Sequence, residues 1–270
     1  MGHPIDTWQR RDPVVIETIA AEHPKFTAPM LLIHGLWCTA AAWHRFMGYL
    51  AHLGWTCHAV NLRGRAETQV PVSIGRVRFA DYLDEVRGAV AACGGPPVVV
   101  GHDLGGLLAL HCAAAARAVV ALAPILPLPL ATEGTHTFLG MRSRLALWCS
   151  QPLPAPRGQR GSDYFAQGAP GGTRLDSGTV ARELTQHDLG FSVDGRVPLL
   201  VVAGAADTIC RPYDVERLAT YAGATYRCLE GVGHALPWQA GWENCVKQIH
   251  RWLVQQLGES LLVLNEEEEP

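Results

Sequence analysis

The chain has 270 residues, of which 48% are hydrophobic and 17% charged, and its formal net charge is -3. This balance suits a well-buried globular core and excludes a disordered chain. The small negative charge gives no electrostatic reason to expect nucleic acid or an anionic membrane as a partner. The length predicts one large α/β domain with an insertion.

The cysteines and the two ends of the chain indicate where the protein works. Eight cysteines are spread singly with no Cys-x-x-Cys pair, which predicts neither a zinc site nor a disulfide framework. Residues 1–12 include charged residues such as Asp6 and Arg10 and no apolar run, so we expect a flexible arm and no signal peptide. Residues 259–270 end in four glutamates and a proline and are also expected to be flexible. The scattered cysteines are expected to be reduced, mostly buried thiols, which predicts a cytoplasmic location. Prolines interrupt the apolar stretch 118–132, so we predict no membrane span.

Strand and helix patterns alternate along most of the chain. Continuous apolar or β-branched runs predict strands, the first of them at a sheet edge, at residues 13–20, 29–37, 57–62, 98–102, 119–123, 198–207 and 225–230. Apolar residues at helical spacing predict helices at 39–53, 79–93, 107–114, 212–221 and 238–257. Strands and helices that alternate with short connections are typical of a doubly wound, mostly parallel sheet.

The alternation stops between residues 125 and 196, which are rich in proline, glycine and arginine. The pattern there predicts helical pieces near 136–149 and 177–188 and no clean strand. We therefore predict an inserted helical lid at 125–196, with a core formed by residues 13–124 and 197–258.

Three titratable residues follow the predicted ends of three strands. The run 98–106, Val-Val-Val-Gly-His-Asp-Leu-Gly-Gly, places Asp103 on a sharp turn from strand to helix, and the flanking glycines permit a strained backbone there. Asp207 ends the run 198–207, and His234 follows the last strand in Gly-Val-Gly-His. The carboxyl ends of parallel strands meet at one edge of a sheet, where open α/β sheets bind their ligands.

This arrangement closely resembles the α/β-hydrolase fold family, in which a nucleophile, an acid and a histidine occur in the same chain order. His34-Gly35 after an earlier strand adds to the resemblance, which covers nearly the whole chain outside the lid. The family usually has serine where this chain has Asp103. An aspartate at that place resembles the epoxide hydrolases and the haloalkane or haloacid dehalogenases of the family.

The carboxylate restricts the chemistry that we expect. Asp103, with an ordinary pKa of about 3.9, is already ionised at neutral pH and needs no base to become a nucleophile. Its attack on an acyl carbon would give a labile anhydride, whereas attack on a saturated carbon gives a stable ester. The resemblance implies that His234, oriented by Asp207, then activates a water that hydrolyses this ester, and that the N–H groups of Leu36 and Leu104 hold the oxyanion. No metal or organic cofactor is expected.

The leaving group separates the two activities of this branch. The resemblance implies two lid tyrosines for an epoxide hydrolase, and Tyr164 is the one tyrosine between residues 125 and 196. It implies a tryptophan directly after the nucleophile for a haloalkane dehalogenase, where this chain has Leu104. We predict an epoxide first and a carbon–halogen bond second, with Tyr164, Trp37 and Trp148 as candidates to assist the leaving group.

Two non-hydrolytic alternatives stay open. A carboxylate buried beside apolar walls has a raised pKa, which would suit Asp103 as the general base of a biosynthetic isomerase, epimerase or cyclase. Asp103 would otherwise be the relic of a serine hydrolase that has become a silent ligand-binding protein. In every case we expect a small molecule as the partner of a monomer or homodimer.

Overall fold

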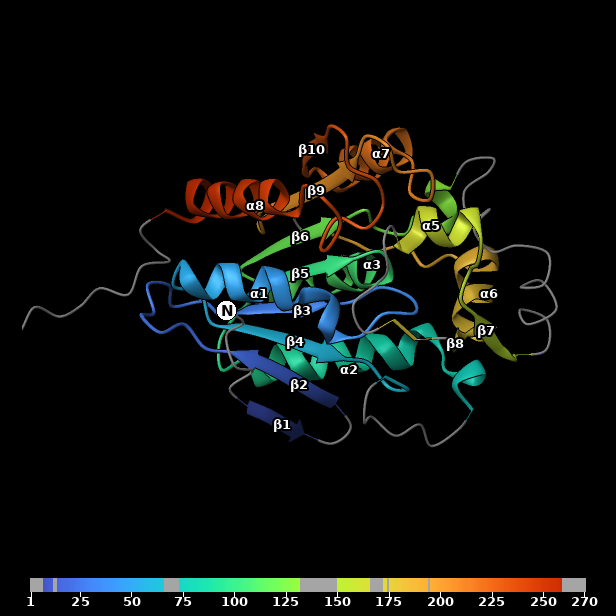
Figure 1. Ribbon diagram of the computed structural model, residues 1–270, viewed down its shortest axis with the longest axis horizontal. Helices are drawn as coiled ribbons and strands as arrows, with labels where there is room; N and C mark the ends of the chain where they lie inside the picture. The colour runs from blue at the N-terminus through green and yellow to red at the C-terminus, as the bar shows by residue number, and fades with distance from the viewer. Residues whose placement is uncertain are drawn as a thin grey trace, which may run out of the picture.

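The computed structural model describes residues 7–11, 14–65, 73–131, 150–165, 172–173, 175–193 and 195–258. In these residues an eight-stranded sheet has the order β1-β2-β4-β3-β5-β6-β9-β10 (Figure 1). The strands are β1 (Thr7–Arg11), β2 (Val14–Ile19), β3 (Met30–Ile33), β4 (Cys57–Asn61), β5 (Val98–His102), β6 (Ala118–Leu122), β9 (Leu199–Gly204) and β10 (Thr225–Leu229). Pairing is parallel from β4 to β10 and antiparallel for β1 and β2. The predicted mostly parallel sheet is confirmed.

Helices on both faces bury the central strands. Every residue of β3, β5, β6 and β9 is buried, as expected for parallel strands between two helical layers. On one face, α1 (His44–His52), which follows η1 (Ala40–Trp43), packs against α8 (Trp242–Leu257). On the other face, α2 (Phe79–Ala92), preceded by η2 (Ile74–Arg76), packs against α3 (Leu104–His111), and α7 (Pro212–Ala222) covers β9 and β10 (Figure 1).

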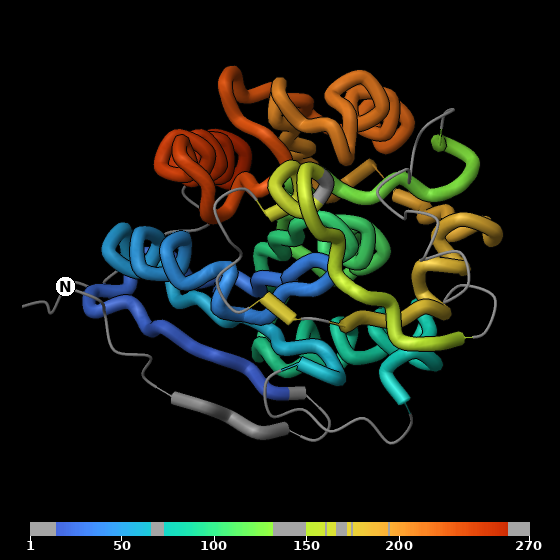
Figure 2. The backbone as a smooth tube through the Cα atoms, turned by 45° about the vertical axis from the view of Figure 1, so that its right-hand side comes forward, coloured from blue at the N-terminus to red at the C-terminus, as the bar shows by residue number. Residues whose placement is uncertain are grey.

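The chain between β6 and β9 leaves the sheet, because these two strands pair directly with each other. We call residues 125–196 the lid segment. Its described elements are η4 (Leu128–Leu130), β7 (Pro152–Pro154), α5 (Gln159–Phe165), β8 (Leu175–Ser177) and α6 (Gly178–Gln186). In Figure 2 the yellow part of this segment, which contains α5, crosses in front of the green α3. The hydroxyl of Tyr164 in α5 contacts Asp103, the residue between β5 and α3, so this part of the lid segment lies over that end of the sheet.

Several sequence predictions need correction. Residues 7–11 form β1, so the flexible arm predicted for 1–12 is wrong there, and the strand at 14–19 lies between two others rather than at an edge. Backbone pairing with β2 holds β1, and its polar sequence carries no strand pattern. The lid segment contains the antiparallel pair β7–β8, although no strand was predicted there. The helix predicted near 136–149 and the tail 259–270 lie outside the described residues.

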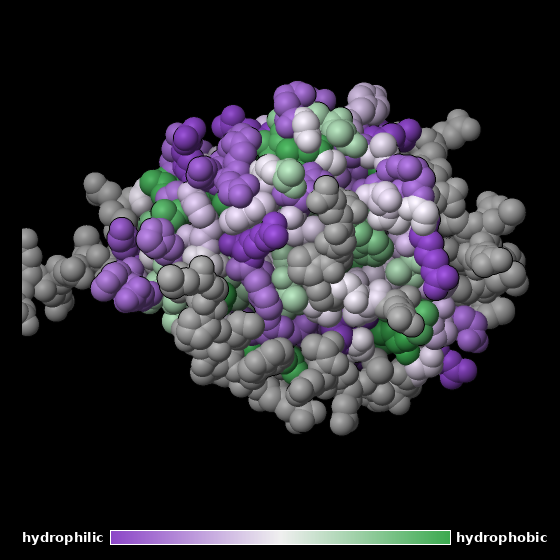
Figure 3. Space-filling view, viewed as in Figure 1, coloured by the Kyte–Doolittle hydropathy of each residue, from purple (hydrophilic) through white to green (hydrophobic). Residues whose placement is uncertain are grey.

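The surface mixes polar and apolar groups. On the face in Figure 3, hydrophilic residues surround small apolar groups over the described part of the chain. Large apolar side chains that are exposed include Tyr213 and Tyr221, at 68% and 58%, and both lie on α7. Among the described residues, no helix combines the length and the apolar composition that a membrane crossing requires.

The turn that carries Asp103 depends on its glycines. Asp103 has φ 57° and ψ -119°, a left-handed conformation that is strained for a residue with a side chain. A Cβ on Gly101 would lie 2.0 Å from the Gly105 carbonyl oxygen, and one on Gly105 would lie 2.2 Å from the Ile33 carbonyl oxygen. The helix α3 can therefore approach β3 and β5 closely only because both positions lack a side chain.

Gly101 of this turn and Gly88 of α2 give a matched test of stability. Gly101→Ala is expected to lower the free energy of unfolding by about 3 kcal/mol, because the methyl group meets backbone that has no room to move. Gly88→Ala in the exposed face of α2, where a Cβ meets nothing within 4 Å, is expected to raise it by about 0.5–1 kcal/mol. Denaturant unfolding of both variants measures the difference, and equal effects would contradict the packing described here.

Candidate active site

Three buried side chains meet at the carboxyl edge of the sheet. Asp103 follows β5, Asp207 lies just beyond β9, and His234 lies in the loop after β10. They are exposed by 0%, 4% and 1%. His234 Nδ1 lies 2.9 Å from Asp207 Oδ2, and His234 Nε2 lies 3.7 Å from Asp103 Oδ1. The structure thus brings together the three residues that the sequence singles out.

Asp207 and His102 fix the orientation of His234. Asp207 Oδ1 accepts the backbone N–H groups of Ile209 and Cys210 at 2.7 and 3.0 Å, while Oδ2 accepts the Nδ1–H of His234. The Nε2–H of His102 donates to the His234 carbonyl at 2.8 Å. Burial, together with the charge of His234, lowers the pKa of His102 to about 4, so this ring is neutral at pH 7. His234 is held from both its ring and its backbone, with Nε2 directed at Asp103.

The two oxygens of the Asp103 carboxylate have different surroundings. Oδ2 accepts the backbone N–H of Leu36 at 2.8 Å and the hydroxyl of Tyr164 at 2.5 Å. Oδ1 and the facing Nε2 of His234 are buried and have no hydrogen-bond partner among the described residues. Leu104, the other predicted oxyanion donor, is buried at the start of α3 directly after Asp103. One carboxylate oxygen is therefore held, and the other faces the imidazole.

Electrostatics favour a charged pair at this site. Burial opposes ionisation of Asp103, but the close approach and charge of His234 and the hydrogen bond from Tyr164 bring its pKa below the ordinary value. Burial also opposes a charge on His234, but the charge of Asp207 and the close approach of Asp103 raise its pKa well above the ordinary value. Burial and the Asp103 charge raise the pKa of Tyr164, so its hydroxyl keeps its proton. Both directions favour a carboxylate on Asp103 beside a protonated His234. The raised Asp103 pKa expected for a general base is not found.

The indole of Trp37 has a different role from the predicted one. Its indole N–H donates to the Leu153 carbonyl at 3.0 Å, so this donor is already used and does not point to a leaving group. Its ring instead packs edge-on against Tyr164, with ring centroids 5.1 Å apart. Tyr164, predicted to assist the leaving group, donates its hydroxyl to Asp103 Oδ2. Trp148, the third candidate, lies outside the described residues.

One group of side chains in the described residues has the spacing of metal ligands. The ligand atoms of Asp207, Cys210 and His234 lie within 4.8 Å of one another, and all three residues are buried. Both Asp207 oxygens already accept hydrogen bonds. Burial raises the pKa of Cys210 to about 12 despite its contact with His234, so the sulfur is a thiol and not a thiolate. These residues are explained as an acid–histidine pair with a neighbouring thiol.

Sequence reasoning missed Asp176 and Arg65, which form a fully buried ion pair beside the site. Asp176 comes just before Ser177, the N-cap of α6, and no pattern in the sequence marks it as a residue of the site. Arg65 lies 111 residues away, in the loop after β4. No local pattern links two charges so far apart, and only the docking of the lid segment brings them together.

Comparisons with known proteins agree with this geometry. The family model described as "Alpha/beta hydrolase family" matches residues 30–248, which include all three residues of the site. The chain belongs to the alpha/beta hydrolase family. No curated protein matches it in sequence.

Solved structures of this hydrolase fold include enzymes of several kinds. A soluble variant of monoglyceride lipase from Saccharomyces cerevisiae has a TM-score of 0.69 at 17% identity, over 94% of this chain and 97% of the lipase. A monoacylglycerol lipase from Paleococcus ferrophilus has a TM-score of 0.66 at 17% identity, over 90% and 98%. The epoxide hydrolase VrEH1 from Vigna radiata has a TM-score of 0.59 at 18% identity, over 90% and 94%. At these identities the likeness shows the fold alone.

The charge on His234 can be measured without a substrate. In a nitrogen-15 NMR titration, His234 is expected to keep its ring proton to well above the ordinary histidine pKa of about 6.5. Asp207→Asn removes the main attraction and is expected to lower the His234 pKa. His250, whose pKa burial lowers, serves as a control that the substitution leaves unchanged. Deprotonation of wild-type His234 below about pH 6.5 would contradict the charged pair.

Proposed function

We propose that this hydrolase opens an epoxide on a small organic molecule through a covalent ester of Asp103. The proposal rests on the different surroundings of the two oxygens of the Asp103 carboxylate. Oδ2 is held by Leu36 and Tyr164, while Oδ1 is open toward an imidazolium. An ionised carboxylate with one oxygen fixed and one free is arranged as a nucleophile.

The nature of the nucleophile points to the electrophile. Lipases and an epoxide hydrolase share this fold, so the fold does not choose among them, and the choice rests on Asp103. Its attack on an ester substrate would form an anhydride, which offers no advantage over the ester it replaces. Its attack on a saturated carbon forms a stable ester that can be hydrolysed in a second step.

In the first step, Asp103 Oδ1 attacks one carbon of the epoxide ring, and the bond between that carbon and the ring oxygen breaks. The ring oxygen stays on the neighbouring carbon as an alkoxide, so it remains inside the covalent ester. His234 Nε2 lies 3.7 Å from Oδ1 and supplies the proton that converts the alkoxide to a hydroxyl. His234 is then neutral. Ester formation also removes the Asp103 charge that helped to raise the His234 pKa.

In the second step, neutral His234 takes a proton from water, and the hydroxide attacks Cγ of the ester. The negative charge that develops on Oδ2 lies between the N–H of Leu36 and the hydroxyl of Tyr164, which act as oxyanion donors. The bond between Cγ and Oδ1 then breaks, and the proton of the new hydroxyl passes to Oδ1, which leaves with the diol. Asp103 is again a carboxylate and His234 an imidazolium, so the proton cycle closes.

The resting charge on His234 favours an epoxide over an alkyl halide. Epoxide opening consumes the imidazolium proton and so prepares the base for the second step. A halide leaves as an anion and takes no proton, so His234 would have to lose its proton to solvent before it could activate water. The lowered pKa of Asp103 also argues against a general base, which works best with a raised carboxylate pKa. A silent binding site has no need of a buried charged pair, whose desolvation is costly.

The His234→Gln variant tests this proposal. With styrene oxide as the probe, the variant is expected to accumulate an ester on Asp103, because solvent water can supply the proton that His234 gives to the alkoxide, whereas hydrolysis of the ester needs the histidine as a base. Intact-protein and peptide mass spectrometry detect the adduct and its position. Asp103→Asn in the same background provides the control and should carry no adduct. Absence of any adduct on Asp103 in His234→Gln would count against the ester route.

A further inference from the structure

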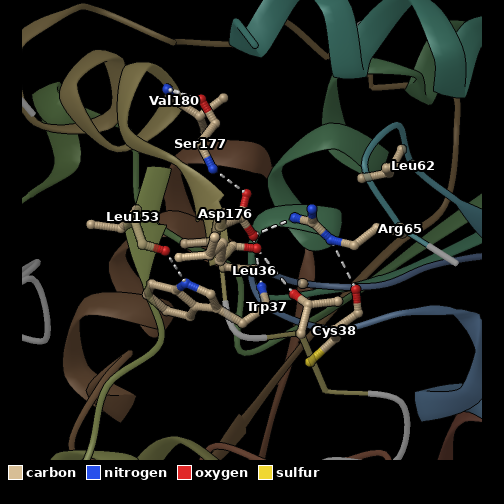
Figure 4. A network of polar contacts seen from close by, with 12 residues as sticks. Leu36, Trp37, Cys38, Leu62, Arg65, Leu153, Asp176, Ser177 and Val180 are labelled. Carbon is tan, nitrogen blue, oxygen red and sulfur yellow. Dashed lines mark hydrogen bonds and ion pairs between the residues drawn. The ribbon is translucent and has the colours of Figure 1, made fainter. Parts of the chain in front are cut away.

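A buried polar network joins the lid segment to the loop that carries the oxyanion donor Leu36 (Figure 4). Its centre is Asp176 of β8, which is fully buried. Asp176 Oδ2 accepts the backbone N–H of Trp37 at 2.7 Å and pairs with the Nη2 of Arg65. Oδ1 accepts the N–H of Ser177 at 2.6 Å and the hydroxyl of Tyr82 at 3.2 Å. One carboxylate therefore collects four donors from four parts of the chain.

Arg65 extends this network to the other side of Trp37. It is exposed by only 1%, and its Nε donates to the Cys38 carbonyl at 3.1 Å. The ion pair of Arg65 and Asp176 thus holds the N–H of Trp37 and the carbonyl of Cys38 at the same time. These two groups bound a single turn of the loop between β3 and η1.

Trp37 itself needs such support. Its φ of 54° is a left-handed conformation that costs free energy for a residue with a large side chain. The lid segment also binds its carbonyl, through the N–H of Thr173 at 2.6 Å, and its indole N–H, through Leu153. The backbone N–H, the backbone carbonyl and the indole of Trp37 are therefore all bonded to lid residues.

We infer that Asp176 is a positioning residue for the oxyanion site. The peptide between Leu36 and Trp37 is oriented by its N–H bond to Asp176, and this orientation directs the preceding N–H, that of Leu36, at Asp103 Oδ2. The lid segment supplies Tyr164 to the same oxygen. Both described donors to Oδ2 thus depend on lid docking. The catalytic part of this inference rests on the proposed function, whereas the positioning part does not.

The chemistry requires a carboxylate at position 176. An asparagine of the same shape has one acceptor oxygen and presents an NH₂ group to donors, so it cannot serve Trp37, Arg65, Ser177 and Tyr82 together. It would also leave the Arg65 charge buried without a counterion. Asp176→Asn is therefore expected to release the Trp37 peptide.

Amide hydrogen exchange followed by NMR tests the positioning. In Asp176→Asn, the amides of Leu36 and Trp37 are expected to exchange at least 100-fold faster, beyond any change in global stability. The control is Thr179→Ala, which removes another buried lid bond, from Thr179 Oγ1 to the Gly75 carbonyl at 2.7 Å, without touching the loop of Leu36. Unchanged exchange at Leu36 in Asp176→Asn, or the same acceleration in Thr179→Ala, would overturn the inference.

A double substitution tests the same inference in a variant that is expected to keep its fold. Replacing a buried ion pair by apolar side chains often preserves stability, so Arg65→Met with Asp176→Leu should fold while lacking the acceptor for Trp37. It is expected to show the same fast exchange at Leu36. A protected Leu36 amide in this folded variant would also overturn the inference.

Styrene oxide separates the catalytic part from the positional part. With His234 intact, Asp176→Asn is expected to accumulate the Asp103 ester, because losing an oxyanion donor slows ester hydrolysis by about 100-fold. Thr179→Ala should turn over without accumulation. If His234→Gln forms no adduct, the proposed function fails while the exchange data still decide the positioning. If His234→Gln forms the adduct and Asp176→Asn does not, the catalytic part of the inference fails alone.

Discussion

The buried negative charge of Asp103 is the constraint on which the rest of the site depends, because the surrounding groups must stabilise it. A carboxylate removed from water is unstable unless charges and hydrogen bonds replace its hydration. Here His234 supplies the charge, and Leu36 and Tyr164 supply two hydrogen bonds to the same oxygen. Asp207 in turn stabilises the charge on His234. The result is a carboxylate whose ionised form is favoured beside a protonated histidine, which is the pair that the proposed ester mechanism uses.

The same constraint makes the lid segment part of the site. Tyr164 reaches Asp103 directly, and Asp176 acts at one remove through Trp37. The second buried charge, on Asp176, is compensated by Arg65. A permanent carboxylate demands compensation at all times, which explains why so much polar bonding converges on the loop of Leu36.

The sequence was sufficient to predict the features that depend on local patterns of residues. The apolar strands and the glycine-flanked turn predicted the sheet and the position of Asp103, and strand order placed Asp207 and His234 beside it. The strand at Thr7–Arg11 could not be predicted, because backbone pairing holds it and its sequence has no apolar pattern. The ion pair of Arg65 and Asp176 could not be predicted, because it depends on how the lid segment docks on the core. The pKa direction of Asp103 was predicted wrongly for a general base, since sequence shows burial but not the imidazolium that outweighs it.

The central claim is that Asp103 forms an ester, and one measurement tests it most directly. Excess enzyme is mixed with styrene oxide in water enriched in oxygen-18 and stopped after a single turnover. Peptide mass spectrometry then locates the label. The proposed route requires the label in the Asp103 carboxylate and an unlabelled diol, because water attacks Cγ and the original Oδ1 leaves with the product. Label in the diol with none in Asp103 would mean that water attacks the epoxide directly, and would contradict the ester mechanism.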